Sequence, residues 1–186
     1  MYRLSLQRNQ QRGPVDRLHL HPWHGIKKNK KGAKAMTTRM QTFVALSEAL
    51  TGISKSVLAP AVTNFDLPTT YFNAAEQKFA DDFGRLLDAF QALLDNGQSA
   101  EDAVTTMMEN DIYAPIAQQI NFLWYMGGWA VVTDFGTQTQ NLSPVTYQKG
   151  MVWQVMQSHP MGYSVSRYGY WGQEPAPLND YIGKGE

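Results

Sequence analysis

A long run of apolar residues at helical spacing, from Phe72 to Leu94, constrains the fold of this chain more than any other feature. Charged and polar residues fill most of the opposite side, so the run predicts one long amphipathic helix. Asp66 is expected to cap its start and Asn96-Gly97 to end it in a left-handed conformation. Gly84, inside the run, either lets another backbone approach closely or has no role. The apolar positions advance by three and four without a miss: Phe72, Ala75, Phe79, Phe83, Leu86, Leu87, Phe90, Leu93 and Leu94.

Four shorter stretches predict further helices. One runs from about Thr37 to Gly52, and a second opens at Ser99, whose spacing to Asp102 resembles a capping box. A third starts near Pro115 and is expected to stop at the Gly127-Gly128 pair. The last begins with Ser143-Pro144, a suitable cap and first-turn proline, and continues to about residue 155. Alternation of the kind that strands show is scarce throughout.

These patterns predict an all-α protein with about five helices in a compact bundle. The helical domain is assigned to residues 36–160, because helical periodicity begins near Met36 and the chain becomes irregular after Pro160. Residues 161–186 are expected to form an extended, aromatic C-terminal arm. Residues 1–35 have sparse apolar residues without a period, which predicts a disordered tail, or a start upstream of the natural one.

The charge of the chain is divided between two regions. Residues 1–39 hold ten of the sixteen basic residues and a single acid, Asp16, whereas the remainder has six basic and fifteen acidic residues and a net charge of −9. The basic tail could contact phosphates of nucleic acid or lipid, and His19, His21 and His24 could bind a metal loosely. The simpler interpretation of the tail is a solvated extension without function. We therefore expect no nucleic-acid partner.

Several classes of protein are excluded or disfavoured. The chain has no cysteine, so disulfides, thiol catalysis and iron–sulfur ligation by its own residues are excluded. No run approaches the roughly 20 apolar residues of a membrane span. The N-terminus has neither the apolar core of a secretory signal nor an adjacent arginine pair.

The sequence offers no convincing catalytic, cofactor-binding or metal-binding set. His159 is the single histidine of the helical domain and follows the last predicted helix, where a surface or capping role is usual. The acidic pairs Asp81-Asp82 and Glu101-Asp102 lie on polar helix faces. A dinucleotide fingerprint, a phosphate-cradling loop and a nucleophile elbow are all absent. We expect no catalytic residue and no bound cofactor in this chain.

Aromatic residues near the C-terminus are the clearest candidates for recognition. An arm rich in glycine and proline cannot easily bury large rings by itself, and tyrosine and tryptophan are typical anchors of protein interfaces. We predict a partner interface at Tyr168, Tyr170, Trp171 and Pro175. The alternative is that the arm folds back and seals the domain's own core.

Four segments in order resemble a known family. They are Phe-Val-Ala-Leu-Ser-Glu-Ala-Leu-Thr-Gly at 43–52, Trp-Tyr-Met-Gly at 124–127, Tyr147 followed by Met-Val-Trp at 151–153, and Tyr-Trp-Gly-Gln-Glu-Pro at 170–175. Together, across roughly residues 40–178, they are similar to the small subunit of membrane-bound, FAD-containing sorbitol, fructose and glucose dehydrogenases of bacteria.

The resemblance implies a helical, chaperone-like accessory subunit without its own activity. The partner large subunit would contain FAD and oxidise the sugar or polyol, and a cytochrome c subunit would pass the electrons onward. The complex would lie on the periplasmic side of the cytoplasmic membrane and be held there through partners only. Family members typically bear a twin-arginine signal, and residues 1–35 depart from that pattern. A free-standing regulatory or nucleic-acid-binding module that uses the basic tail is the alternative.

Overall fold

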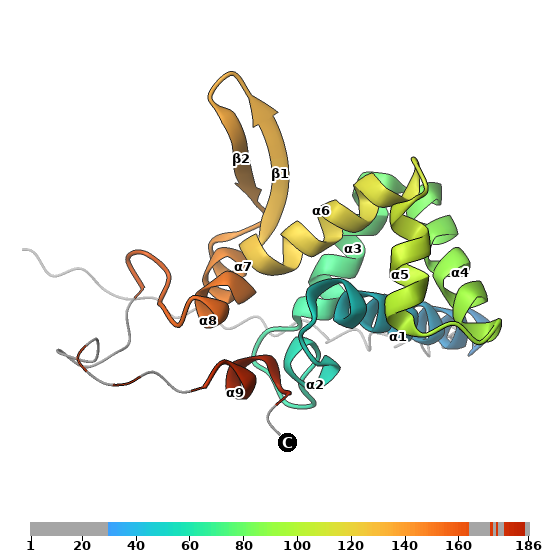
Figure 1. Cartoon of the computed structure of the whole chain (residues 1–186), viewed down its shortest axis with the longest axis horizontal. Helices are drawn as coiled ribbons and strands as arrows, with labels where there is room; N and C mark the ends of the chain where they lie inside the picture. The colour runs from blue at the N-terminus through green and yellow to red at the C-terminus, as the bar shows by residue number, and fades with distance from the viewer. Residues whose placement is uncertain (1–29, 164–171, 173, 175–176, 185–186) are drawn as a thin grey trace, which may run out of the picture.

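The computed structural model describes residues 30–163, 172, 174 and 177–184, and most of these residues are helical. The long helices form the body of the molecule, and a two-stranded antiparallel hairpin projects from it (Figure 1). The predicted all-α class is therefore confirmed. In chain order the elements are α1 (Lys30–Thr51), α2 (Lys55–Leu58), α3 (Leu67–Phe79), α4 (Asp81–Asp95), α5 (Ala100–Met108), α6 (Tyr113–Met126), β1 (Gly128–Thr133), β2 (Gly136–Asn141), α7 (Pro144–Lys149), α8 (Met151–Val155) and α9 (Leu178–Ile182).

The core is built around Phe43 of α1. Its ring lies 5.7 Å from that of Phe72 in α3, 5.8 Å from Phe83 in α4 and 6.3 Å from Trp124 in α6. All four side chains are buried. Edge-to-face and stacked contacts of this kind add to the free energy of burying the rings. One aromatic cluster thus joins four helices, and the rest of the molecule is arranged about it.

The prediction of a single helix from residue 67 to 96 is wrong. The run is divided at Ala80, which has φ 47° and ψ −122° and separates α3 from α4. The apolar spacing continues across the break because both helices bury their faces in the same core, with the rings of Phe72 and Phe83 5.3 Å apart. At Gly84 the neighbour is a side chain and not a backbone, since a Cβ there would lie 3.6 Å from the Arg39 guanidinium.

Most predicted helix ends are confirmed. Side chains of Asp66, Ser99 and Ser143 accept hydrogen bonds from backbone N–H groups at the starts of α3, α5 and α7. Only Ser143 forms a reciprocal capping box; at Ser99 the hydroxyl instead donates to the Asp102 carboxylate at 2.8 Å. Gly97, with φ 87°, follows α4 as expected.

Three elements depart from the prediction. The hairpin β1–β2 was not predicted, because the polar β2 shows no apolar alternation. The last predicted helix is divided into α7 and α8 at Gly150, where a Cβ would lie 2.6 Å from the Tyr125 carbonyl oxygen. A short helix, α9, stands within the region predicted as an extended arm.

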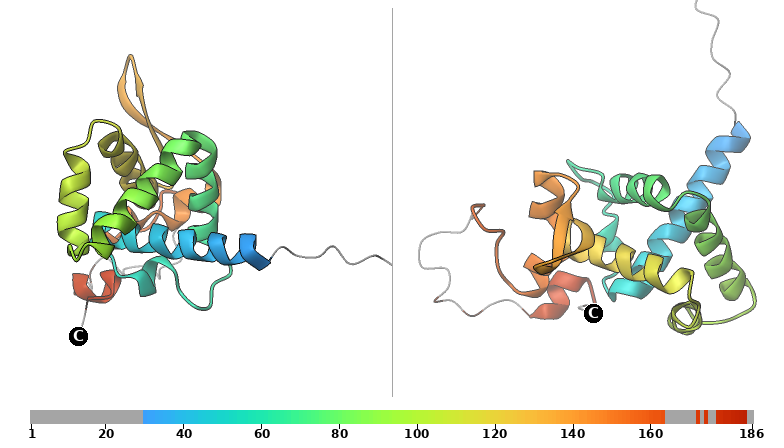
Figure 2. Two further views of the ribbon diagram at one scale, coloured as in Figure 1. Left: turned by 90° about the vertical axis from the view of Figure 1, so that its right-hand side faces the viewer. Right: turned by 90° about the horizontal axis from the view of Figure 1, so that it is seen from above.

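Helices lie near both ends of the described chain. Helix α1 begins at Lys30, before residue 36, and its first turns extend beyond the body (Figure 2). Helix α9 returns to the body, where the Ser54 N–H donates to the Ile182 carbonyl at 2.9 Å and Ile182 packs against the core. This part of the arm folds back onto its own domain.

Candidate partner interface

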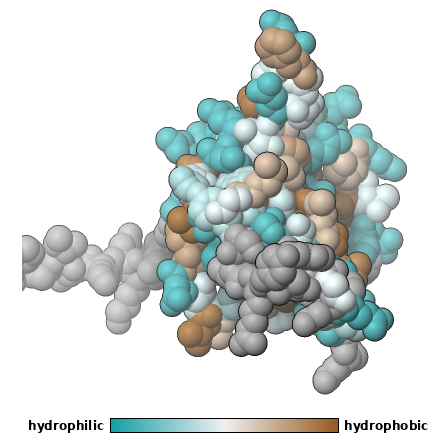
Figure 3. Space-filling view, turned by 90° about the vertical axis from the view of Figure 1, so that its left-hand side faces the viewer, coloured by the Kyte–Doolittle hydropathy of each residue, from teal (hydrophilic) through white to brown (hydrophobic). Residues whose placement is uncertain are grey.

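Many of the exposed large apolar side chains of the described residues belong to one segment of the chain. We call residues 128–163 the hairpin region; it contains β1, β2, α7, α8 and the segment that follows α8. Six of the ten large apolar side chains exposed in the described chain belong to it: Val132, Phe135, Val145, Met156, Met161 and Tyr163. Figure 3 shows hydrophobic surface at the tip of the hairpin. We take the hairpin region as the candidate partner interface, because exposed apolar side chains are a feature of interaction surfaces.

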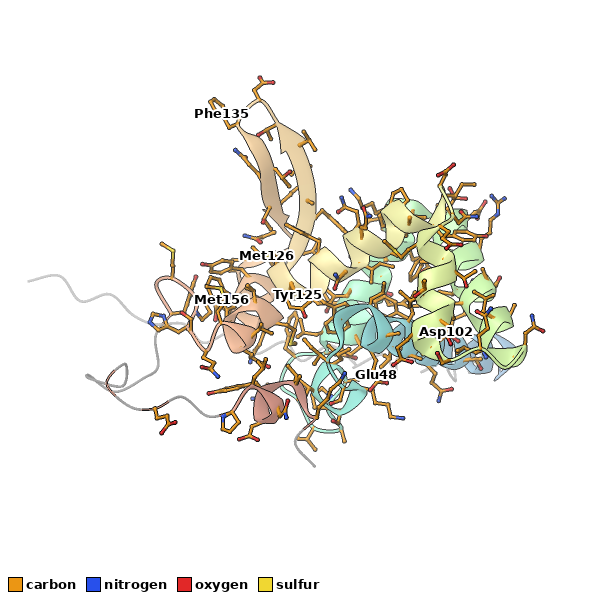
Figure 4. All side chains as sticks on the ribbon, viewed as in Figure 1. Glu48, Asp102, Tyr125, Met126, Phe135 and Met156 are labelled. Atoms are coloured by element: carbon orange, nitrogen blue, oxygen red, sulfur yellow. The ribbon has the colours of Figure 1, made fainter. Side chains whose placement is uncertain are left out.

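The tip of the hairpin is the most exposed point of this region. Asp134 and Phe135 form the two-residue connection between the paired residues Thr133 and Gly136. Gly136 has φ 95°, which turns the chain at the start of β2, and the Phe135 N–H donates to the Thr133 hydroxyl at 3.2 Å. The Phe135 ring is 92% exposed and stands at the far end of the hairpin from Tyr125 and Met156 (Figure 4).

A side-chain clamp fixes the hairpin to the body. The Gln119 amide of α6 donates from Nε2 to the Ala130 carbonyl at 3.0 Å, and its Oε1 accepts from the Ala130 N–H at 3.1 Å. Trp129, one residue earlier, is buried and packs edge-on against Phe79 at 5.6 Å. The hairpin therefore leaves the body in a defined direction.

Glycines at the root of the hairpin allow the backbones to meet. Gly127 ends α6 with φ 73°, as predicted for a helix stop. A Cβ on Gly127 would overlap the Thr146 backbone, and one on Gly128 would overlap the backbone of Gln140. Close approach of α6, β2 and α7 thus requires residues without side chains at both positions.

Aromatic rings support the base of the region. The Tyr147 ring lies 5.2 Å from Trp153 and 6.4 Å from Tyr163, and Trp153 Nε1 donates to the Tyr147 carbonyl at 2.7 Å. Tyr163 and Tyr147 line a hollow of about 440 Å³ together with residues 141–144. Rigid rings around a hollow are suited to receive a side chain from a partner.

The residues predicted for the interface, Tyr168, Tyr170, Trp171 and Pro175, lie outside the described residues. Tyr163 is the nearest described aromatic that precedes them, and it is exposed beside the hairpin region's hollow. Sequence reasoning missed Val132 and Phe135. Their signal is a β-branched and aromatic stretch between Gly128 and Gly136, which periodicity alone does not assign to a strand.

The two described groups with clearly shifted pKa values are tyrosines that make structural contacts. Burial raises the pKa of Tyr71 far above its usual value and also raises that of Tyr125, but Tyr71 lies in the core against Trp124 and Tyr125 donates to the Thr51 carbonyl at 2.8 Å. Within residues 38–163 and the described parts of the arm, histidines and carboxylates form no group of three able to hold a metal. His159 Nδ1 is 3.0 Å from the Pro160 carbonyl oxygen.

One groove of the described chain lacks the features that a dinucleotide site usually has. The groove between α1 and residues 59–61 has a volume of about 710 Å³ and is lined largely by apolar side chains, including Met40, Val44 and Ala59. A dinucleotide site needs a glycine-rich turn that opens a helix and presents backbone N–H groups to the pyrophosphate. Neither wall of this groove provides one.

Comparison with known proteins identifies the family. Among curated proteins, none matches the chain. In the described part of the chain, no helix combines the length and the apolar character that crossing a membrane requires. A family model described as membrane bound FAD containing D-sorbitol dehydrogenase matches residues 18–175, which is most of the chain. The protein therefore belongs to this family, the small-subunit family of the membrane-bound, FAD-containing D-sorbitol dehydrogenase.

Proposed function

We propose that this chain is a non-catalytic accessory subunit that binds the FAD-containing large subunit of a sugar or polyol dehydrogenase and supports its folding and stability. The observation that carries the proposal is the hairpin region, whose apolar side chains are exposed although its root is fastened to the core. Exposed apolar surface on a rigid support suits a permanent partner. Members of the family are subunits of a membrane-bound dehydrogenase complex, and a larger subunit of that complex would be a permanent partner of this kind.

The ionisable groups support a role in binding over one in catalysis. A general acid or base often has a shifted pKa and must lie where substrate can reach it. Tyr71 is buried in the core, and Tyr125 holds the end of α1 through its bond to Thr51. The acidic pairs Asp81-Asp82 and Glu101-Asp102 lie in the first turns of α4 and α5, where their negative charges interact favourably with the helix dipole.

The proposal extends to the assembly and its location. The large subunit would hold FAD and oxidise the substrate, and a cytochrome c subunit would accept the electrons. The complex would lie on the periplasmic side of the cytoplasmic membrane, with this chain attached through its partners and assisting export of the large subunit.

Co-expression tests the proposal. The large flavoprotein subunit of the same complex is produced with and without this chain, and its soluble yield, flavin-to-protein ratio and dye-linked dehydrogenase activity are measured. We expect yield and flavin content to fall several-fold without the small subunit, and the small subunit alone to be inactive. Equal yield and full flavin content of the large subunit alone would refute the proposal.

A parallel measurement addresses the alternative function. The isolated chain and a form lacking residues 1–35 are titrated with duplex DNA and with RNA at several salt concentrations. Specific binding that weakens steeply with salt and requires residues 1–35 would favour a nucleic-acid-binding module. We expect no binding that survives physiological salt.

A further inference from the structure

The backbone of β2 presents hydrogen-bonding groups away from the hairpin. Ala130 faces Thr139 in the register of the two strands. In an antiparallel pair, opposite residues either exchange backbone hydrogen bonds or both turn these groups outward. Gln119 binds both the N–H and the C=O of Ala130 from outside the hairpin. The pair is therefore of the outward kind, and the N–H and C=O of Thr139 point away from β1.

Alternation extends this result along the strand. The outward groups of β2 belong to Thr137, Thr139 and Asn141. A second contact agrees with this assignment. The Leu142 N–H donates to the Gly127 carbonyl at 3.1 Å, so Gly127 and Leu142 form a hydrogen-bonded pair. The next pair, Gly128 and Asn141, is then of the outward kind. Among the described residues, no backbone group outside β1 bonds to the outward N–H and C=O groups of these three residues.

The two edges of the hairpin differ in how they are covered. On the β1 side, the Gln119 amide takes the place of a neighbouring strand at Ala130. On the β2 side, the sequence Gly-Thr-Gln-Thr-Gln-Asn has no charge and no proline. Natural proteins usually protect a free strand edge with lysine, proline, a bulge or a covering element. Within β2 itself, the first two of these devices are missing.

One face of the hairpin offers apolar contact beside this edge. Val132 lies opposite Thr137 and is 87% exposed. Thr139 lies on the same face, two residues along from Thr137. A strand placed beside β2 would have β-branched neighbours on this face, and such cross-strand pairs stabilise a sheet.

We propose that the outer edge of β2 accepts an extended segment of the large subunit as a third strand. This inference rests on the proposed function. N–H and C=O groups that recur at every second residue are matched by another extended backbone, the mode known as strand addition. Membership of a dehydrogenase-complex family favours a strand of the larger partner over one from a second copy of this chain. The incoming segment is expected to place β-branched or aromatic side chains on the face of Val132 and Thr137.

Amide hydrogen exchange at single-residue resolution tests the inference on the free chain and on the co-purified complex. We expect the amides of Thr137, Thr139 and Asn141 to exchange at least tenfold more slowly in the complex. The amides of Gln138 and Gln140 bond to β1 in both states, so their protection changes little. Protection that alternates in this way is specific to strand addition, because burial under a side-chain contact would not follow backbone direction.

A backbone variant with a matched control provides a second test. Thr139→Pro removes an N–H that the hairpin does not use, and edge strands tolerate proline at such positions. Thr139→Val keeps the N–H and the β-branched shape. We expect Thr139→Pro to weaken the complex by about tenfold or more and Thr139→Val to bind like the wild type. Circular dichroism of Thr139→Pro checks that the variant is folded.

The outcomes separate the two proposals. If the wild-type chain does not co-purify with the flavoprotein, the proposed function fails. If the complex forms but the three amides stay rapidly exchanging and Thr139→Pro binds as well as the wild type, strand addition alone is refuted. If the free chain is a dimer in which these amides are already protected, a second copy occupies the edge and the large subunit does not.

Discussion

Tyr71 is buried and Tyr125 is half-buried, and their hydroxyl groups differ in what they contact. The Tyr125 hydroxyl donates to the Thr51 carbonyl at 2.8 Å and so joins α6 to the end of α1. The Tyr71 hydroxyl is fully buried and has no hydrogen-bond partner among the described residues. A buried polar group without a partner lowers stability, whereas a satisfied one raises it modestly. The same substitution should therefore have opposite effects at the two positions.

We predict that Tyr71→Phe raises the free energy of unfolding by about 1 kcal/mol, because it removes an unsatisfied hydroxyl from the core. Tyr125→Phe should lower it by about 1 kcal/mol, because the Thr51 carbonyl loses its donor. Urea denaturation of both variants measures the two changes. Loss of stability in both would show that the Tyr71 hydroxyl has a partner in solution.

Burial also predicts how stability depends on pH. The pKa of Tyr71 is raised in the folded state by desolvation, whereas an unfolded tyrosine ionises near pH 10. Below about pH 10 both states keep the proton and stability does not depend on this group. Above that pH the unfolded state loses a proton that the folded state retains, so stability falls by up to about 1.4 kcal/mol per pH unit. Thermal melts from pH 8 to 11 should show a shallower decline for Tyr71→Phe, and an unchanged decline would contradict the prediction.

Most of the longer helices were predictable from their apolar stripes, and side-chain caps at the starts of α3, α5 and α7 gave a further local signal. Predicted positions such as Phe72, Phe83 and Phe90 are buried. The break at Ala80 was not predictable, since neither glycine nor proline marks it and the stripe continues in phase. The hairpin part of the candidate interface was not predicted, because β2 has no buried face and its sequence therefore lacks the alternation of apolar and polar residues. Tertiary contacts, above all Gln119 with Ala130, hold that element in place.

We predict that Gln119→Leu loosens the hairpin and leaves the helical body folded. The substitution removes both bonds to Ala130, so the Ala130 amide should exchange about tenfold faster. Gln118→Leu, on the exposed side of α6, is the matched control and should leave exchange in the hairpin unchanged. Hydrogen exchange followed by mass spectrometry of peptides covering residues 128–141 makes the comparison. Equal rates in both variants would show that the clamp contributes nothing.

The glycine at the hairpin root gives a second prediction at this scale. Gly127→Ala places a Cβ against the Thr146 backbone at φ 73°, so we expect it to lower the free energy of unfolding by more than about 2 kcal/mol. Gly97 has φ 87° but open space around it, and Gly97→Ala should cost about 1 kcal/mol from the backbone alone. Chemical denaturation of the pair separates crowding from backbone strain. Similar losses would mean that the root can move apart.

The surface of the described chain differs in character from one part to another. The outer faces of α3, α4 and α5 are mostly polar. The exposed ion pairs Arg39–Asp88, between α1 and α4, and Arg85–Asp82, within α4, contribute little to stability. The hairpin region exposes apolar side chains instead. A protein that served only its own fold would gain nothing from this distribution, whereas a subunit that is buried against a larger partner would.

We predict that Phe135→Ser weakens the complex with the large subunit by about tenfold or more while leaving the melting temperature of the free chain unchanged. The matched control is Val62→Ser, because Val62 is 91% exposed and lies between α2 and α3, away from the hairpin region. It should affect neither quantity. Co-purification, or binding to the large subunit immobilised on a sensor surface, measures the affinity of each variant. Equal weakening by both variants would indicate a contact surface that is not centred on the hairpin.

Gly127, Gly128 and Gln119 hold the hairpin through backbone atoms, so the amino-acid sequence of the hairpin tip can change during evolution without loss of the fold. Substitutions between residues 131 and 139 alter no contact of the aromatic core, so selection for folding constrains them weakly. The tip can therefore diverge in step with its counterpart on another chain. In a cell with several related complexes, such paired divergence would keep each small subunit with its own large subunit and prevent cross-assembly.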